Sequence, residues 1–462
     1  MPPLQEEKKG MFDGVTWYHW AVVIIASCGW LFDCMDQQIF ALARQSAAKS
    51  LLDPEAVTWF VALSRSFFKI PLDQLSPAEA KEKVTWFVFT MATSSMILGW
   101  ATGGIIFGMM SDKIGRVKTM VATLLVYSSF TGLCGLSVSW WDFLIYRFLT
   151  GLGVGGMFGA ATTLVAESVP TRLRTFALGI LQTLSATGNF VGALISLGIK
   201  PGSTNFWGEM EGWRVLFFVG LLPALLVVPT ILILREPEAW KKAKADAAAG
   251  IGRKNVGAIG DLFRIPRWRR NTLVGIGLGF AGMVGLWGIG FFSPELITEA
   301  LKGQPQPYVD TVRSKGLMLQ HAGSFLGMLT FTFVASWLGR RRAFGIAFPL
   351  CLVVTMYVFS SLKTETDAYW MLPMMGFVHL SLFAGYSIYF PELFPTRLRG
   401  TGVGFCYNTV RYLTVPGPLL LGHLTMLWSF RTAAVVMSCV FLVGLIALIW
   451  APETKGQPLP ED

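Results

Sequence analysis

Long apolar stretches recur along the whole of this 462-residue sequence, separated by mostly short polar segments. A helix needs roughly 20 apolar residues to cross the ~30 Å hydrocarbon core of a bilayer. Twelve stretches meet that length, which predicts an all-α membrane protein with twelve transmembrane helices in two six-helix halves. They run approximately over residues 17–43, 84–110, 119–138, 143–166, 174–199, 213–234, 271–297, 316–338, 343–362, 368–391, 400–424 and 429–451.

The composition supports a chain whose surface faces lipid. Hydrophobic residues make up 53% of the chain, charged residues only 14%, and the mean hydropathy is +0.54. A soluble domain carries about a quarter charged residues, so an ordinary soluble enzyme and a disordered chain are both excluded. The six cysteines lie in apolar stretches without a C-x-x-C pair. We therefore expect no metal site and no disulfide framework. No cofactor and no enzymatic activity are expected either.

The distribution of Lys and Arg predicts the orientation. If the N-terminus is cytoplasmic, the segments on that side hold most of the basic residues, in agreement with the positive-inside rule. We expect a multi-pass protein of the cell (inner) membrane with both termini in the cytoplasm. The formal net charge of +10 is then a signal of topology, so the expected partner is the lipid bilayer and no nucleic acid.

Two long connections divide the sequence. Residues 44–83 are expected outside, with a helix starting near Ser76, where serine suits an N-cap and the following proline the first turn. Residues 235–270 are basic and are expected to form a cytoplasmic linker. This linker separates an N-terminal six-helix half, residues 1–234, from a C-terminal six-helix half, residues 271–462.

The two halves carry an internal repeat. The segment Glu167-Ser-Val-Pro-Thr-Arg-Leu-Arg174 follows the fourth stretch, and Glu392-Leu-Phe-Pro-Thr-Arg-Leu-Arg399 follows the tenth. Six of the eight positions are identical, and each copy has the same place in its half. Two six-helix repeats in the same orientation are typical of transporters whose halves rock about a central site.

One motif links the sequence to a known family. The segment Gly108-Met-Met-Ser-Asp-Lys-Ile-Gly-Arg-Val-Lys118, between the second and third stretches, resembles the G-x-x-x-D-[RK]-x-G-R-[RK] signature of the major facilitator superfamily. Gly108 permits close helix contact, Asp112 suits a helix N-terminus, and Arg116 suits an ion pair. Such contacts would lock the cytoplasmic side while the protein is open outward. The resemblance assigns to this gate Gly108, Asp112, Gly115, Arg116, Glu167, Arg172, Glu392 and Arg397.

The second half contains a weaker copy of this motif. The segment Ala335-Ser-Trp-Leu-Gly-Arg-Arg-Arg342 keeps the glycine and the basic residues but lacks the acid. Its role as a lock is therefore open.

The first stretch favours a branch of the superfamily. Its Asp33-Cys-Met-Asp36 segment resembles the D-x-x-D of aromatic-acid:proton and sialate or monocarboxylate:proton symporters. Pro452-Glu-Thr-Lys-Gly456 resembles instead a tail motif of sugar porters and organic-ion carriers, but the seventh stretch lacks the paired glutamines with which sugar porters bind hydroxyl groups. A sugar or organic-cation porter stays an alternative. A non-transporting membrane sensor would need a signalling domain, and the linker is too short and polar for one.

Ionisable residues inside membrane spans are costly and are candidates for function. Asp33 and Asp36 share one face of a helix, and two carboxylates close together in a low-dielectric medium favour the binding of a proton. His379 also suits proton transfer, although a buried histidine is as often a packing residue. The expected proton-coupling residues are Asp33, Asp36 and His379.

Arginine binds carboxylates with two parallel hydrogen bonds, so arginines in spans suit an organic anion. Arg147 resides in the fourth stretch and Arg411 in the eleventh. Amide side chains in the fifth and eleventh stretches offer further hydrogen bonds. The expected substrate-binding residues are Arg147, Gln182, Asn189, Asn408 and Arg411; for Arg147, Gln182 and Asn189 a structural role is an equal alternative.

Asp36 and Arg147 are expected at the same depth of the membrane, from the rise of 1.5 Å per helical residue. An unpaired charge at that depth is costly, and a partner of opposite sign offsets much of the cost. We therefore expect the two side chains to face each other across the outer half of the cavity. The pair would serve either to tie the proton to the substrate or as a permanent brace between the first and fourth helices.

A glycine pattern in the fourth stretch resembles a nucleotide-binding motif. Gly151-Leu-Gly-Val-Gly-Gly156 matches G-x-G-x-x-G, but a preceding strand is required for phosphate binding and the motif lies in a membrane span. The pattern predicts close helix packing instead. With no nucleotide-binding P-loop either, the expected energy source is an ion gradient.

Together these features predict a secondary active transporter. The expected activity is proton-coupled symport of an organic anion, most simply a carboxylate, by alternating access. We expect it to function as a monomer with a small organic anion and a proton as partners.

Overall fold

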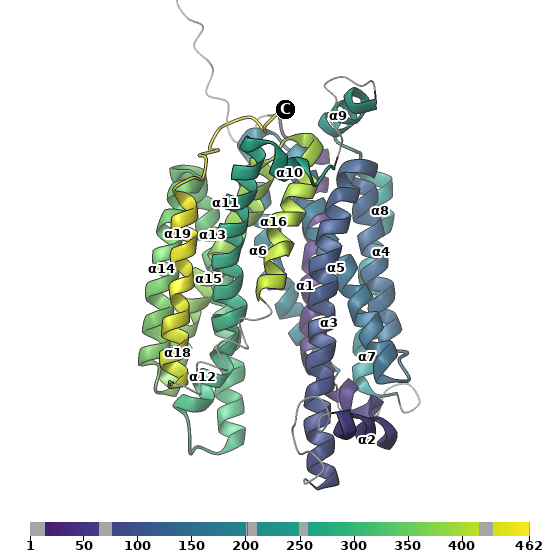
Figure 1. The fold of residues 1–462 in the computed structure, drawn as a ribbon, viewed down its shortest axis with the longest axis vertical. Helices are drawn as coiled ribbons and strands as arrows, with labels where there is room; N and C mark the ends of the chain where they lie inside the picture. The colour runs from purple at the N-terminus through teal and green to yellow at the C-terminus, as the bar shows by residue number, and fades with distance from the viewer. Residues whose placement is uncertain are drawn as a thin grey trace, which may run out of the picture.

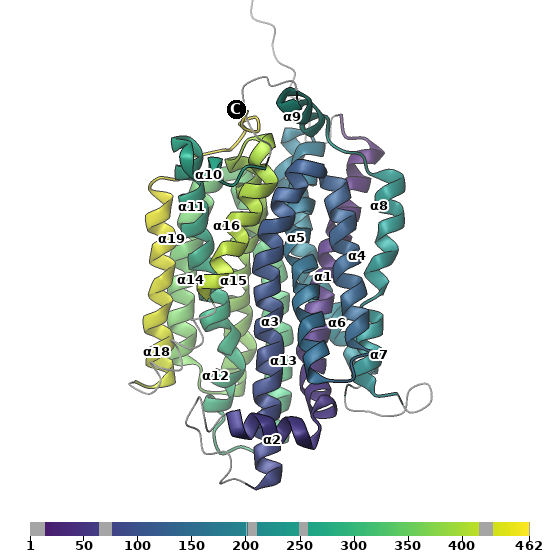
Figure 2. The same cartoon turned by 45° about the vertical axis from the view of Figure 1, so that its right-hand side comes forward.

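The chain folds into two helical bundles that lie side by side (Figures 1 and 2). The computed structural model describes residues 14–63, 76–199, 201, 210–248, 257–414 and 428–461. We call the helices from α1 to α8 the first bundle and those from α11 to α19 the second bundle. The helices α9 and α10 lie near the C-terminus at one end of the molecule, the linker end; α2 and α12 lie at the opposite end, the α2 end (Figure 1).

The element bounds follow the chain. The first bundle contains α1 (Trp17–Leu51), α2 (Pro54–Leu63), α3 (Pro77–Ile114), α4 (Arg116–Cys134), α5 (Trp140–Ser168), α6 (Thr171–Gly198), α7 (Gly212–Val219), η3 (Leu222–Leu226) and α8 (Val227–Ile233). The connection holds α9 (Glu238–Ala248) and α10 (Asp261–Arg264). The second bundle contains α11 (Pro266–Met283), η5 (Val284–Ile289), η6 (Gly290–Phe292), α12 (Ser293–Ala300), α13 (Gln306–Leu338), α14 (Arg340–Ser361), α15 (Glu365–Leu393), η7 (Thr396–Leu398), α16 (Arg399–Thr414), α18 (Phe430–Met437), η8 (Ser438–Val440) and α19 (Phe441–Leu448).

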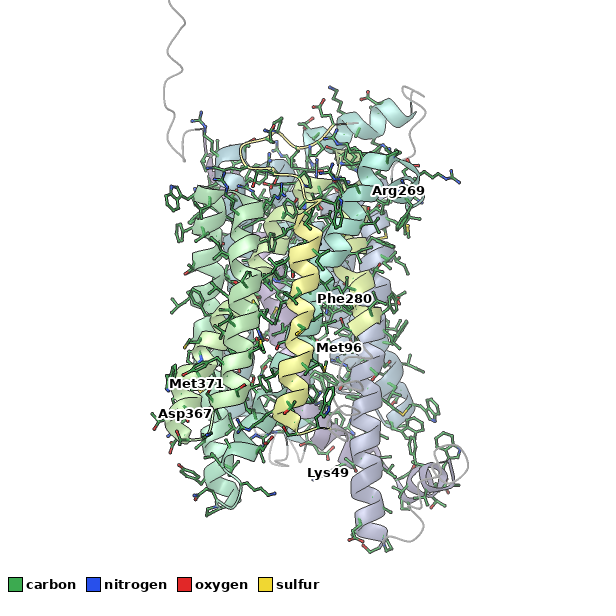
Figure 3. The ribbon with its side chains drawn as sticks, turned by 60° about the vertical axis from the view of Figure 1, so that its left-hand side comes forward. Lys49, Met96, Arg269, Phe280, Asp367 and Met371 are labelled. Atoms are coloured by element: carbon green, nitrogen blue, oxygen red, sulfur yellow. The ribbon has the colours of Figure 1, made fainter. Side chains whose placement is uncertain are left out.

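Among the described residues, 10 segments are long and apolar enough to cross a membrane. In chain order α6 and α16 stand where the fifth and eleventh stretches are predicted. α6 is as apolar as several of these segments, but some of its side chains lie outside the described part of the chain. α16 is described only to Thr414, so residues 415–424 of the predicted stretch also lie outside it. In Figure 3 the labelled apolar Met96 and Phe280 lie near mid-height, and Arg269, Lys49 and Asp367 lie toward the two ends.

Side chains at the helix starts satisfy the free backbone N–H groups there. Ser76 caps α3 and forms a reciprocal capping box with Glu79, as the sequence predicts for Ser76. Ser139 and Asp142 form the same arrangement at the start of α5. These caps fix where two of the longest helices begin.

Glycines with positive φ make the sharp turns between two helix pairs at the linker end. Gly115, with φ +121°, joins α3 to α4, and Gly339, with φ +96°, joins α13 to α14. An L-residue with a side chain is strained in this conformation. The motif glycine Gly115 is therefore required by the turn itself.

The glycine-rich segment of α5 packs against α3. A side-chain carbon at Gly151 would overlap the backbone oxygen of Met96, and one at Gly155 would overlap that of Trp100. This close approach of two backbones agrees with the predicted packing role of the segment.

Described contacts between the bundles involve the linker-end halves of their helices. α3 meets α16, where the backbones of Gly104 and Gly404 approach so closely that a methyl group on Gly404 would overlap the Gly104 oxygen. α6 meets α13, where the rings of Phe176 and Phe333 lie 6.2 Å apart. Small residues and aromatic rings thus hold this end together.

Candidate functional site

Asp36 and Arg147 form a buried ion pair inside the first bundle. Arg147 Nη1 lies 3.7 Å from Asp36 Oδ2, and neither side chain is exposed. This contact confirms the pairing expected from their depths. The Arg147 guanidinium lies between the rings of Phe40 and Phe217, with ring centroids 5.0 Å and 4.9 Å away. The aromatic faces stabilise the cation where water is excluded.

Helices α4 and α5 supply the remaining partners of Arg147. Its Nη2 donates to the hydroxyls of Thr131 at 3.3 Å and Thr150 at 3.2 Å, and its Nε to the sulfur of Cys134 at 3.1 Å. Arg147 is therefore fixed by α1, α4, α5 and α7, all in the first bundle. In this conformation it lies within that bundle and is fully enclosed.

Asp33 lies one helical turn from Asp36 and is equally buried. It interacts electrostatically with Asp36 and with Arg411 of the second bundle. Arg411 donates to the amide oxygen of Asn408 at 3.2 Å, and its guanidinium stacks on the ring of Trp100 at 3.4 Å. Asp36 thus pairs with an arginine of its own bundle, whereas neither carboxylate oxygen of Asp33 accepts a described hydrogen bond.

A stacked aromatic pair joins the bundles beside Arg411. The rings of Phe158 on α5 and Tyr407 on α16 lie 3.9 Å apart and nearly parallel. Arg411 also lies 5.1 Å from the Tyr407 ring centroid. Both aromatic side chains are buried, so the stacked rings and the cation lie together in the interior between the bundles.

The other predicted polar residues divide into two groups. Gln182 is buried on α6, and its amide oxygen accepts no described hydrogen bond; Asn189 is half-buried farther along α6. His379 lies in the second bundle, where its Nε2 is 2.7 Å from the Thr355 hydroxyl and its ring packs on Phe441. None of its described contacts is with Asp33 or Asp36.

The motif acid Asp112 connects α3 to the start of α16. Its carboxylate accepts hydrogen bonds from the backbone N–H groups of Gly400 at 3.0 Å and Thr401 at 2.7 Å. It also pairs with Arg116 at 3.1 Å. An acid at a helix N-terminus is stabilised by the unpaired N–H groups and the helix dipole.

Arg116 and Arg399 converge on one carboxylate. Arg116 Nε lies 2.9 Å from Glu167, and Arg399 of the second bundle also pairs with Glu167. Arg116 further donates to the backbone oxygen of Thr396 across the bundles at 2.7 Å. The network locks the linker end of α3, α5 and α16.

The weaker second-half motif also bridges the bundles. Arg340 pairs with Glu392 through two hydrogen bonds of 2.9 Å and 2.8 Å. It also donates to the Thr175 hydroxyl on α6 of the first bundle. Arg340 thus reaches the other bundle without the acid that the first motif uses.

Two motif arginines have other positions. Arg397 pairs with Asp261 of α10 at 2.6 Å, which ties the connection to the second bundle. Arg172 is exposed at the linker end, near the start of α6.

A sequence profile of the Major Facilitator Superfamily matches residues 57–415. The chain belongs to this superfamily. It is 28% identical over 418 residues to a cis,cis-muconate transport protein of Acinetobacter baylyi, across 87% of this chain and 96% of that protein. It is also 28% identical over 350 residues to the sialic acid transporter NanX of Escherichia coli, across 75% and 80% of the two chains.

The superfamily fold is also seen in solved structures. The structure of the proton:xylose symporter XylE bound to 6-bromo-6-deoxy-D-glucose has a TM-score of 0.72 at 16% identity, covering 96% of this chain and 98% of that one. At this identity the likeness shows the fold alone. With the relatives named as transport proteins, superfamily membership supports a membrane carrier rather than an enzyme.

Several residues around the charged pairs escape sequence reasoning. Trp100 and Tyr407 face Arg411, but an aromatic residue in an apolar stretch does not differ in sequence from one that faces lipid. Thr131 and Cys134 of α4 accept hydrogen bonds from Arg147. Nothing in the sequence distinguishes them from other small polar residues in apolar stretches. Arg399 is the exception, because it is the last residue in the second copy of the internal repeat, Glu392–Arg399.

Proposed function

We propose that this protein is a proton-coupled symporter of an organic carboxylate, working by alternating access in the bacterial inner membrane. The linker end and both termini are assigned to the cytoplasm, following the distribution of basic residues. The protein acts as a monomer, each bundle serving as one rocking half. The relatives named as muconate and sialic acid transporters support a carboxylate substrate.

One observation carries the proposal. Asp36 pairs with Arg147 inside the first bundle, and Asp33, one turn away and equally buried, interacts electrostatically with Arg411 of the second bundle. A charge that changes on one aspartate alters the field at the other, because they are one turn apart. The arrangement therefore couples a proton to an anion across the interface between the bundles.

Proton binding at Asp36 neutralises the partner of Arg147. The freed guanidinium is then unbalanced in a buried site, and an incoming carboxylate restores the balance. In this scheme proton and substrate enter together, which is the condition for symport. His379 is given no part in it, because its contacts lie within the second bundle.

Arg411 is a second substrate contact beside Arg147. A guanidinium on the Trp100 face offers its edge to a carboxylate, and Tyr407 with Phe158 supplies a flat apolar surface. Asn408 and Gln182 donate or accept further hydrogen bonds, as does Asn189 farther along α6. The site is suited to an anion with a planar apolar body.

The gate residues hold the cytoplasmic side closed in this conformation. Asp112, Arg116 and Glu167 act with Arg399, and Glu392 acts through Arg340. Opening toward the cytoplasm breaks these contacts together, and closure re-forms them. The conformation described is therefore assigned as outward-facing or occluded.

Uptake into liposomes tests the proposal. The purified protein is reconstituted with a proton gradient, acidic outside, and supplied with labelled cis,cis-muconate, sialic acid or xylose. We expect uphill accumulation of a carboxylate that an uncoupler abolishes. Accumulation of xylose without that of either acid would favour the sugar-porter alternative instead.

A further inference from the structure

A cavity of about 600 Å³ lies at the linker end where the two bundles meet the C-terminal tail. Its walls include Arg172 and Thr175 of α6, Ser336 of α13, Arg340 of α14, and Lys455 of the tail. We call it the linker-end crevice. Both bundles thus contribute residues to one hollow.

Internal symmetry shows what the crevice lacks. Asp112 stands four residues before Arg116, and Ser336 stands four residues before Arg340. In the first bundle the Asp112 carboxylate fills the space between α3 and α16. The Ser336 hydroxyl donates instead to a backbone oxygen of its own helix, at 2.8 Å. No side chain at this position supplies the negative charge that its counterpart supplies.

Basic side chains outnumber acidic ones among the described residues that line the crevice. Arg172, Arg340 and Lys455 line it together with the acid Glu392. The charge of Glu392 is already balanced, because its carboxylate holds Arg340 through two hydrogen bonds and accepts one from Thr454 at 2.6 Å. Lys455 gives a hydrogen bond to a backbone oxygen at 2.7 Å, and an ammonium has two further protons to donate.

Apolar residues border the same crevice. The rings of Phe176 and Phe333 line it, and Phe333 is 59% exposed. Trp337, on the next turn of α13, is 76% exposed. Large exposed apolar side chains on a membrane-spanning helix face lipid, and Trp is typical of the interface. The crevice therefore combines a cationic interior with a border that meets acyl chains.

We propose that the linker-end crevice binds a phosphate group, that of an anionic phospholipid headgroup or of a free phosphate. The anion takes the place that the Asp112 carboxylate has in the first bundle. Because α6 and α13 belong to different bundles, the bound group holds them together and favours the conformation closed at the linker end. This regulatory effect rests on the proposed alternating access, whereas the binding itself does not.

Binding is measured on the full-length protein in a neutral detergent. Phosphatidylglycerol, phosphatidylcholine or inorganic phosphate is added, and the thermal unfolding midpoint is followed. We expect phosphatidylglycerol to raise the midpoint and phosphatidylcholine to leave it unchanged. An equal rise with inorganic phosphate would identify a soluble anion as the source. Equal responses to phosphatidylglycerol and phosphatidylcholine, with none to phosphate, would overturn the proposal.

Charge removal tests the location. A double variant with Arg172→Gln and Lys455→Gln is expected to weaken the affinity roughly 30-fold, since each basic residue near an anionic headgroup contributes about fivefold. A double variant with Arg264→Gln and Arg269→Gln is the matched control, because both arginines are exposed at the same end of the molecule, outside the crevice (Figure 3 labels Arg269). A loss of the same size in the control would assign the effect to general surface charge and overturn the site.

Charge replacement gives a second, independent test. Ser336→Asp supplies the missing carboxylate from the chain itself, so the variant is expected to lose its response to the anion while it stays folded. A wild-type response in this variant would overturn the proposal. Both tests measure binding and do not require transport. Their results are therefore independent of whether the protein shows symport in liposomes.

Discussion

Glu236 and Glu453 cap equivalent helices of the two bundles. The Glu236 carboxylate accepts hydrogen bonds from the backbone N–H groups of Arg116 at 2.6 Å and Lys118 at 3.1 Å, at the start of α4. The Glu453 carboxylate does the same for Arg340 at 3.0 Å and Arg341 at 3.1 Å, at the start of α14. Each acid lies in the segment that follows the last span of its bundle. This segment therefore contacts the start of a helix near the middle of the same bundle.

Removal of the Glu453 charge is expected to destabilise the protein near neutral pH. Burial acts to raise the pKa of Glu453, and backbone N–H groups from Arg340 and from Lys455 outweigh it and hold that pKa below its ordinary value of 4.5. The folded protein therefore favours the ionised form of the Glu453 carboxyl group. We expect Glu453→Gln to cost about 1 kcal/mol, the usual size of a lost cap.

The pH dependence of this variant has a defined sign. A depressed pKa gives stability that is present above about pH 4.5 and is lost as the pH falls through the folded-state value. The difference in unfolding midpoint between wild type and Glu453→Gln is thus expected to be full at pH 7 and to shrink below pH 4.5. Thermal unfolding across this range checks it, and a difference that grows in acid would contradict it.

Replacement of Asp36 is expected to uncouple transport from the proton gradient. Asp36→Asn keeps the size of the side chain but binds no proton, so uphill accumulation is lost while exchange of substrate down its gradient is retained. Arg147 is then left buried without its partner, which costs roughly 3–5 kcal/mol. The double variant with Arg147→Gln removes both charges and controls for folding. Full accumulation in Asp36→Asn and in Asp33→Asn would remove the proton site from α1.

Arg411→Lys is expected to weaken substrate binding without loss of the fold. An ammonium keeps the charge but cannot give two parallel hydrogen bonds or stack flat on Trp100. A loss of one to two charge-assisted hydrogen bonds corresponds to an affinity lowered roughly 10- to 100-fold. Isothermal titration with the transported acid measures it. Near-normal affinity would make Arg411 a structural residue.

Much of this architecture is readable from the sequence. Periodic apolar stretches predict the helices, and the equal depths of Asp36 and Arg147 predict their contact, because both follow from the rise along a helix. The partners of Arg411 are different. Trp100 reaches it from the other bundle, and a contact between helices far apart in the chain depends on their relative rotation, which an apolar stretch does not encode. The hydrogen bond from Arg340 to Thr175 could not be predicted from the sequence for the same reason.

We expect closure of the linker end to require the close approach of α3 and α16. The variant Gly404→Ala tests this requirement. The added methyl group would overlap the backbone oxygen of Gly104, and no rotation of a side chain relieves an overlap with backbone. The two helices must separate, so the variant is expected to favour the conformation open at the linker end. Gly345→Ala is the matched control, because a methyl group there meets no atom within 4 Å.

Spin labels on the two bundles report this opening. Lys118 and Arg342 are exposed at the linker end, one on each bundle, and the distance between labels at these positions is measured by double electron–electron resonance. We expect Gly404→Ala to shift the distribution to longer distances and Gly345→Ala to leave it unchanged. A distribution identical to wild type in Gly404→Ala would mean that the glycine contact between α3 and α16 does not control closure, and the gate would then rest on the polar contacts of Asp112, Glu167 and Arg340.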